Sequence, residues 1–373
     1  MLFYLFVGIF TSLLAHIAIS NYDRNKNLFY VSFPLLILFP SIIEGCRDWN
    51  LGSDMLGYGS IYFYDSLHYN NVGTFLSNLD TKEYGYHLLC YFCGKVGTIN
   101  LYMFIAALIK MTMIALTCLH FRKITIPWMV VFGYMLFFYW YGFSLMRQSL
   151  AMSICMYSLV YLYEKKYLFF LFAVAAAYFF HNSSIFILIL PFVMIMAKMK
   201  HRLLIVILGV GTVYILASTL FMAIATSGLF AESKAELYLD SGVTSAKTNI
   251  IIMIGFALFP YLRKNVEGNL KYYIQAYSLL GLMFLSLSSL FEVAFRISFY
   301  QMIPLLILIP SLLKNMEDKT QQLICISIYI CLFLLHIVIA ANHGMADTVP
   351  YRSIILNNLL GCPVLCSNIN SLV

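Results

Sequence analysis

Long runs of apolar residues, separated by short polar stretches, dominate this chain. The first run, MLFYLFVGIFTSLLAHIAIS, contains no lysine, arginine or carboxylate. Strands of a membrane β-barrel alternate apolar and polar positions, whereas these runs are continuous. Continuous runs are typical of helices, which satisfy their backbone polar groups internally in lipid. The pattern therefore predicts an all-α membrane protein.

Twelve segments are apolar enough to be read as membrane spans, which need about 20 residues, or fewer where the helix is short or the bilayer thins. They are 2–20, 28–44, 100–119, 126–143, 145–163, 167–180, 185–198, 203–226, 249–262, 271–290, 297–313 and 322–341. The apolar segment 84–97 is broken by His87 and Lys95, so we expect a partial or re-entrant helix there. No repeat or linker divides the chain, and we expect one membrane domain over residues 1–373.

Lysine and arginine are distributed unevenly between the loops. Six loops that alternate with the predicted spans hold 14 of the 23 basic residues. Because basic loops face the cytoplasm, we expect both termini outside, with the larger outer segments 45–99, 227–248 and 342–373. Four arginines depart from this bias, all on the outer side: Arg47, Arg147, Arg296 and Arg352.

Composition agrees with a membrane protein. The chain is 62% hydrophobic and 10% charged, whereas soluble domains carry about 25% charged residues. The net charge of +7 fits basic cytoplasmic loops and gives no reason to expect nucleic acid. The nine cysteines do not follow a zinc-site spacing. Without an acidic cluster, we expect neither a metal nor a cofactor.

The outer arginines predict an anionic ligand, since guanidinium binds phosphate through a fixed set of donors. Arg147 and Gln148 open a predicted helix whose N-terminus favours anions, although Arg147 could simply snorkel to the interface. Arg47 and Asp54 flank a loop, where they could instead pair with each other. Lys110 is the only lysine deep in a predicted span.

Other polar residues on the outer side could act as a base or bind substrate. Asp54, Glu292 and His181 are the candidate bases, in that order. Glu292 lies four residues before Arg296, so the two could also form a local salt bridge, and His181 at a turn could be structural. Tyr351 precedes Arg352, and both are candidate substrate ligands. Tyr58 could stack on a sugar or lie at the membrane interface.

Several of these motifs resemble those of EpsG-type membrane proteins. CRDWNLGSDMLGY matches an R-x-x-x-x-G-x-D-x-x-x-Y signature, with Ser53 where threonine is usual. LMRQSLAMSICMYSLVYLYEKKYLFFLFAVAAAYFFHNSSIFIL resembles the most recognisable block of the family, and FRISFYQMIPLLILIP and VPYRSII resemble its later elements. The matching positions are Arg47, Gly52, Asp54, Tyr58, Arg147, Gln148, His181, Ser183, Arg296 and Arg352.

The resemblance implies a Wzy-type polymerase of bacterial surface polysaccharides in the cytoplasmic membrane, with a GT-C-like helical architecture and its active site facing the periplasm. Its substrates would be undecaprenyl-pyrophosphate-linked oligosaccharides, and a chain-length regulator would be a partner. Arg147 and Arg296 are the first choices for stabilising the leaving pyrophosphate, with Arg352 and Arg47 next, in a metal-independent reaction.

Other functions stay open at this point. A flippase for the same lipid would need a deep polar cavity and an inverted repeat, which the sequence does not indicate. A ligase that transfers the finished glycan would carry nearly the same outer chemistry. A membrane acyltransferase would have only His181 in its support.

Overall fold

The computed structural model describes residues 1–79, 83–226, 246–263, 266, 268–288, 292–344 and 347–360. The described residues are predominantly helical and include no β-strand, as predicted. Most of the predicted outer segment 227–248 and the end of the tail, residues 361–373, lie outside the described residues.

All twelve predicted spans coincide with helical segments. The N-terminal helices are α1 (Leu2–Asn21), α2 (Lys26–Cys46), α6 (Ile99–His120), α7 (Pro127–Tyr134) with the π-helix η3 (Met135–Tyr139) and α8 (Tyr141–Ser144), α9 (Met146–Tyr163) and α10 (Tyr167–Phe180). They are followed by η4 (Asn182–Leu188), α11 (Ile189–Met196), α12 (Arg202–Thr226), α14 (Ala246–Leu258), η5 (Phe259–Leu262), α15 (Gly268–Leu287), α16 (Glu292–Lys314) and α17 (Lys319–Asn342). The predicted partial helix is α5 (Tyr84–Val96).

Within the residues that the structure describes, five helical segments are long and apolar enough to cross a membrane: Leu2–Asn21, Lys26–Cys46, Ile99–Lys123, Ala294–Lys314 and Lys319–Asn342. Five more apolar helical segments in the described part of the chain are shorter, with 10–17 residues. These findings support a membrane protein. The count of twelve spans stays a prediction.

The chain forms two compact units. Unit 1 comprises Met1–Arg122, Val131–Ser184 and the described part of Ala341–Val373, and unit 2 comprises Lys123–Val130 and Ile185–Ala340. The single membrane domain predicted from sequence is not tested by this division.

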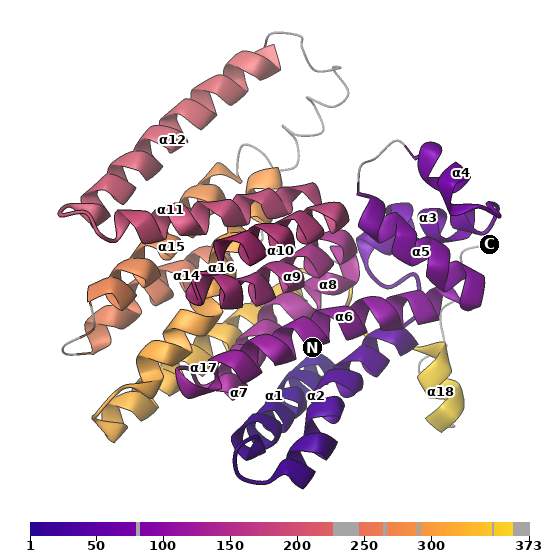
Figure 1. The fold of residues 1–373 in the computed structure, drawn as a ribbon, viewed down its shortest axis with the longest axis horizontal. Coiled ribbons are helices and arrows are strands. Elements are labelled where there is room, and N and C mark those ends of the chain that lie inside the picture. Colours follow the sequence, from indigo (N-terminus) through magenta and orange to yellow (C-terminus); the bar gives the residue numbers. More distant parts are fainter. Residues whose placement is uncertain are drawn as a thin grey trace. The chain divides into compact units, whose positions relative to one another are not determined.

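In unit 1, α2 packs against both α1 and α6 (Figure 1), and α9 packs against α6 and α10. The predicted outer segment 45–99 contains short helices that were not predicted: η1 (Met55–Gly59), α3 (Ser60–Ser66) and α4 (Val72–Ser77). Met55, Phe63 and Tyr86 are buried in one apolar cluster with Tyr102 of α6 and Met146 of α9. This cluster ties the predicted outer segment to α6 and α9.

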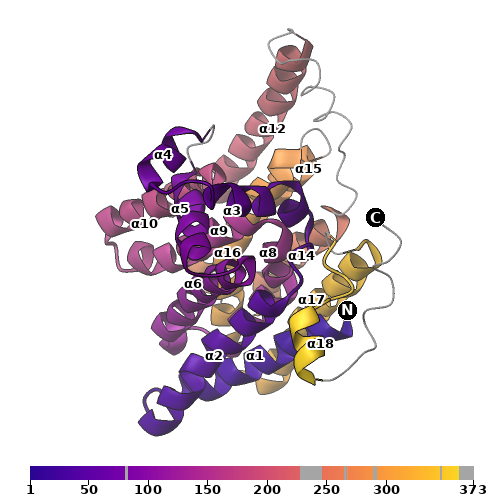
Figure 2. The ribbon, with the colours of Figure 1, turned by 90° about the vertical axis from the view of Figure 1, so that its right-hand side faces the viewer.

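The last carbonyls of α2 have no partner within the helix, as at every helix end, and other segments supply donors. Asn100 donates to the Gly45 carbonyl at 2.8 Å and to the Arg47 carbonyl at 3.0 Å. The tail contributes Tyr351, which donates to the Ile43 carbonyl at 2.7 Å, and Ser353, which donates to the Cys46 carbonyl. Helix α18 (Ile354–Leu360), which begins next to this contact, lies beside the end of α2 (Figure 2).

The loop after α2 requires a glycine at position 52. Gly52 has a φ of +102°, which L side chains rarely adopt. A Cβ atom there would also lie 2.5 Å from the Phe143 carbonyl oxygen. The chain can therefore pass close to the segment before α9 only because this position has no side chain.

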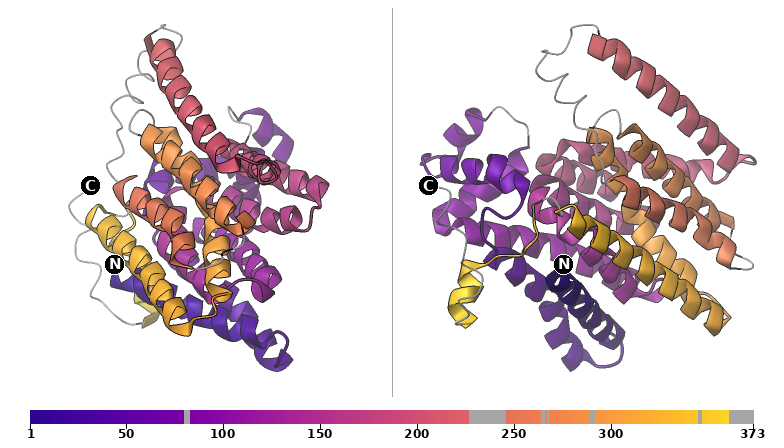
Figure 3. Two further views of the ribbon diagram at one scale, coloured as in Figure 1. Left: turned by 90° about the vertical axis from the view of Figure 1, so that its left-hand side faces the viewer. Right: turned by 180° about the vertical axis from the view of Figure 1, so that it is seen from behind.

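In unit 2, α15 packs against α12, α14 and α16 (Figure 3). Met283 and Phe284 of α15 form a buried cluster with Ala294 and Ile297 of α16. Aromatic rings join α17 to α14, because Phe256 stacks on Tyr329 with ring centroids 6.0 Å apart.

We predict that Asn100→Ala destabilises unit 1, because two carbonyls at the end of α2 lose their donor. Each buried acceptor left unpaired costs about 1–3 kcal/mol. A lower thermal midpoint of the detergent-solubilised protein would be measured. Asn315→Ala is the matched control, since Asn315 donates to the Ser311 carbonyl in an exposed position and its loss should matter little.

Candidate active site

A carboxylate, Glu83, connects two residues that the sequence places in separate segments. Its Oε2 accepts a hydrogen bond from Arg147 at 2.6 Å, and its Oε1 lies 2.7 Å from Nδ1 of His181. The backbone N–H of Asn182 donates to the same Oε1 at 3.1 Å. The Glu83 side chain is only 5% exposed, while those of Arg147 and His181 are 20% and 18% exposed.

These contacts keep Glu83 ionised. Burial alone would raise the pKa of Glu83, because the charged form loses hydration. The hydrogen bond from His181, the charge of Arg147 and the Asn182 amide outweigh this effect, so the pKa of Glu83 falls below its usual value of 4.5. Near neutral pH the group is a carboxylate that can only accept hydrogen bonds.

Local backbone structure brings the three side chains together. Arg147 lies in the first turn of α9, and His181 ends α10 in an extended conformation. Glu83 directly precedes α5, whose first turn contains Gly85. A Cβ atom at Gly85 would lie 3.1 Å from the Phe179 carbonyl oxygen, so the start of α5 lies close to the end of α10.

Arg147 also contacts a tyrosine that is bound to a second carboxylate. Its guanidinium carbon lies 4.2 Å from the centre of the Tyr58 ring, a cation–π contact. The Tyr58 hydroxyl donates to Oδ2 of Asp54, one helical turn earlier. Burial and then the charge of Asp54 raise the pKa of Tyr58, despite the opposing charge of Arg147. Tyr58 therefore keeps its proton and remains a donor.

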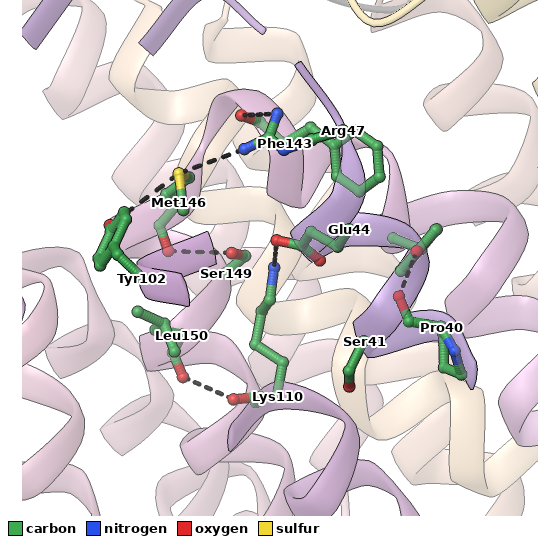
Figure 4. Close-up of polar contacts among 12 residues, drawn as sticks. Pro40, Ser41, Glu44, Arg47, Tyr102, Lys110, Phe143, Met146, Ser149 and Leu150 are labelled. Atoms are coloured by element: carbon green, nitrogen blue, oxygen red, sulfur yellow. Dashed lines mark hydrogen bonds and ion pairs between the residues drawn. The ribbon is translucent and has the colours of Figure 1, made fainter. Parts of the chain in front are cut away.

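Arg47 is completely buried, and its guanidinium donates to backbone carbonyls rather than to another charged side chain (Figure 4). It donates to the carbonyl of Leu51, to that of Phe143 at 3.1 Å and to the sulfur of Met146 at 3.4 Å. These contacts join the loop after α2 to the residues immediately before Arg147. They favour a role in placing Arg147. That Arg47 itself binds phosphate stays a prediction.

A buried ion pair lies one turn before Arg47 (Figure 4). Nζ of Lys110 on α6 is 2.5 Å from Oε1 of Glu44 on α2, and the two side chains are 2% and 0% exposed. Oε2 of Glu44 is buried without a hydrogen-bond partner. The lysine predicted to lie deep in a span thus has its counter-charge on the neighbouring helix.

The other predicted site residues are distributed over both units. Gln148 is buried on α9, and Tyr351 donates to the end of α2 as described above. Arg352 is partly exposed, and its Nε is buried without a partner. Arg296, also partly exposed, lies in unit 2 on α16. Glu292 begins α16, but its side chain lies outside the described residues.

Sequence reasoning missed both Glu83 and Glu44. Each had a recognisable signal. Glu83 is a carboxylate directly before an apolar helix on the same predicted side as Arg147 and His181, in a chain with only 16 acidic residues. Glu44 ends a predicted span, where an ionisable residue needs a partner, and Lys110 is the corresponding lysine.

Among the described residues, no group of three or more His, Cys, Asp or Glu side chains could hold a metal ion. Metal independence stays a prediction.

Comparisons with known proteins identify the family. No curated protein and no solved structure matches the chain. The family model of the EpsG family matches residues 30–353, which are most of the chain and include Glu83, Arg147 and His181. This protein therefore belongs to the EpsG family.

Proposed function

We propose that this protein is a Wzy-type glycan polymerase that moves a growing glycan from undecaprenyl pyrophosphate onto a new lipid-linked repeat unit. Membership of the EpsG family indicates a membrane polysaccharide polymerase-type function in general. The finer proposal is carried by the cluster of Arg147, Glu83 and His181, with Asp54 and Tyr58 beside it. We place this chemistry at the periplasmic face of the bacterial cytoplasmic membrane.

Arg147 is the proposed ligand of the leaving pyrophosphate. Negative charge grows on that group as the glycosidic bond breaks, and a positioned cation stabilises it. Arg147 lies in the first turn of a helix, where the free backbone amides also favour anions. The Arg147 side chain is 20% exposed, so a ligand can reach part of the guanidinium. Arg296 and Arg352 are proposed as further phosphate ligands.

The acceptor hydroxyl needs a base, and this proposal leaves Asp54, Glu292 and His181 as candidates. Aromatic rings next to the site provide surfaces for a sugar. Tyr58 and Tyr62 lie with ring centroids 5.8 Å apart, and the Tyr62 ring lies 4.6 Å from that of His87. The proposed reaction is metal-independent, and a chain-length regulator is the proposed partner.

We predict that Arg147→Ala and Arg296→Ala each shorten the polymer and lower its yield by about 100-fold, the usual effect of losing one charge-stabilising donor. Glycans from a deletion strain expressing each variant would be sized on gels. Arg122→Ala is the matched control, because Arg122 also pairs with a carboxylate, Asp23, and stacks on a tyrosine, Tyr22. Polymer of normal length and amount from both variants would contradict the assignment.

The deletion strain also separates polymerase from ligase, whose outer chemistry would be similar. Loss of a polymerase leaves single repeat units on the final acceptor. Loss of a ligase leaves full-length polymer on the lipid carrier. The second result would replace the proposed polymerase by a ligase.

We predict that substitution of Arg47 mainly lowers stability, whereas substitution of Arg147 mainly lowers polymer yield. Arg47→Met leaves the carbonyls of Leu51 and Phe143 without their donor, so the thermal midpoint should fall, at about 1–3 kcal/mol per carbonyl. Arg147→Ala should lower polymer yield with a smaller loss of stability, since Glu83 keeps its contacts to His181 and Asn182. An Arg47→Met protein of normal stability that cannot polymerise would instead make Arg47 a direct ligand.

A further inference from the structure

We propose that Glu83 is a positioning residue that holds the proton of His181 on Nδ1 and leaves Nε2 as the base for the acceptor hydroxyl. The identity of that acceptor rests on the proposed function. The arrangement of protons on His181 does not, since it follows from the hydrogen bonds of the cluster.

The direction of the hydrogen bond between Glu83 and His181 determines which ring nitrogen carries the proton. Oε1 of Glu83 accepts the backbone N–H of Asn182 at 3.1 Å and lies 2.7 Å from Nδ1 of His181. A carboxylate oxygen has no proton to give, so Nδ1 must be the donor. A neutral imidazole has one N–H and one lone pair. With the proton on Nδ1, the lone pair is on Nε2.

Backbone hydrogen bonds hold His181 in place and so restrict the orientation of its ring. The backbone N–H of His181 donates to the Ala177 carbonyl at 3.0 Å, and its own carbonyl accepts from Ser184 at 3.1 Å. Both ends of the residue are thus held, while its side chain remains 18% exposed. A carboxylate on Nδ1 of a held histidine is the arrangement that orients a general base in hydrolases.

The other carboxylates are less suited to be the base. Both oxygens of Glu83 accept hydrogen bonds, from Arg147 on one side and from His181 and Asn182 on the other. Oδ2 of Asp54 accepts the Tyr58 hydroxyl, and a hydrogen bond to a carboxylate lowers its basicity. The cluster therefore favours His181.

In the proposed chemical step, the acceptor hydroxyl replaces pyrophosphate at the anomeric carbon of the donor. The acceptor hydroxyl gives its proton to Nε2 while its oxygen forms a bond to the anomeric carbon of the donor. The bond from that carbon to the pyrophosphate oxygen breaks, and its electron pair leaves on the pyrophosphate. The imidazolium that forms is stabilised by Glu83 and returns its proton to water.

The tautomer can be measured without any activity. The sample is protein labelled with ¹⁵N histidine, in detergent at a pH where imidazole is neutral. The chain contains eight histidines. The His181 signals are identified as those missing from the spectrum of His181→Gln. We expect ¹⁵N shifts of an Nδ1–H tautomer, changed in Glu83→Gln toward Nε2–H. An Nε2–H tautomer in the unaltered protein, or no change in Glu83→Gln, would overturn the proposal.

Activity gives the second readout. With purified protein and a defined lipid-linked repeat unit, we expect Glu83→Gln to lower kcat about 100-fold and to change KM little. His181→Gln should lower kcat similarly, and the double variant should be no worse than either single one. Independent, multiplying losses would overturn the proposal. So would a raised KM at unchanged kcat, since Glu83 would then act through Arg147 alone.

Glu164→Gln is the matched control. Glu164 also lies near a histidine, with Oε1 3.4 Å from Nε2 of His120, and its side chain is 30% exposed. This variant should retain normal activity and leave the His181 signals unchanged. The Nδ1–H tautomer in a protein that never extends a lipid-linked unit would reject the proposed function alone. Full activity in Glu83→Gln would reject the role of Glu83 alone.

Discussion

A buried carboxylate needs positive charges or hydrogen-bond donors as partners. The partners of Glu83 in this protein come from two segments that are distant in sequence. Arg147 is 64 residues away and His181 is 98 residues away. The pairing therefore requires α5, α9 and the end of α10 to be in place together. If any of the three shifted, Glu83 would lose one or more of its partners, and a buried charge without any partner is strongly destabilising.

Contacts between side chains and backbone carbonyls hold the segments around this cluster in place. Donors from Asn100, Tyr351 and Ser353 satisfy the last carbonyls of α2. Arg47 then joins the following loop to the residues before Arg147. The catalytic groups proposed here thus stand on segments whose backbone polar groups are satisfied by side chains from other parts of unit 1.

Helix positions could be predicted from sequence because a continuous apolar run indicates a helix in apolar surroundings without any information about the rest of the chain. The positions of α6, α9 and α10 were predicted to within a few residues for this reason. The short helices α3, α4 and α18 were not, since their stability depends on packing against residues elsewhere, such as Phe63 against Tyr102. The number of helices that cross the membrane depends on their depth in lipid, which apolar length alone does not determine.

The chemistry of the candidate site was only partly predictable. The arginines on the predicted outer side could be recognised from charge segregation, but the contrast between Arg47 and Arg147 could not. The two differ in what surrounds the guanidinium: backbone carbonyls for Arg47, and a carboxylate and a tyrosine ring for Arg147. Glu83 was missed because its partners lie far away in sequence. Its place directly before an apolar helix marks it as a candidate, but does not identify Arg147 and His181 as its partners.

The pair between Glu44 and Lys110 has a consequence for how the protein is made. A lysine in the middle of an apolar helix resists transfer into lipid, yet Lys110 occupies that position in α6. Its partner lies 66 residues earlier in the chain, so the ribosome delivers Glu44 first. By the time α6 reaches the insertion machinery, α2 is already present to receive the ammonium group. The order of synthesis thus provides a counter-charge for Lys110 before its own helix enters the membrane.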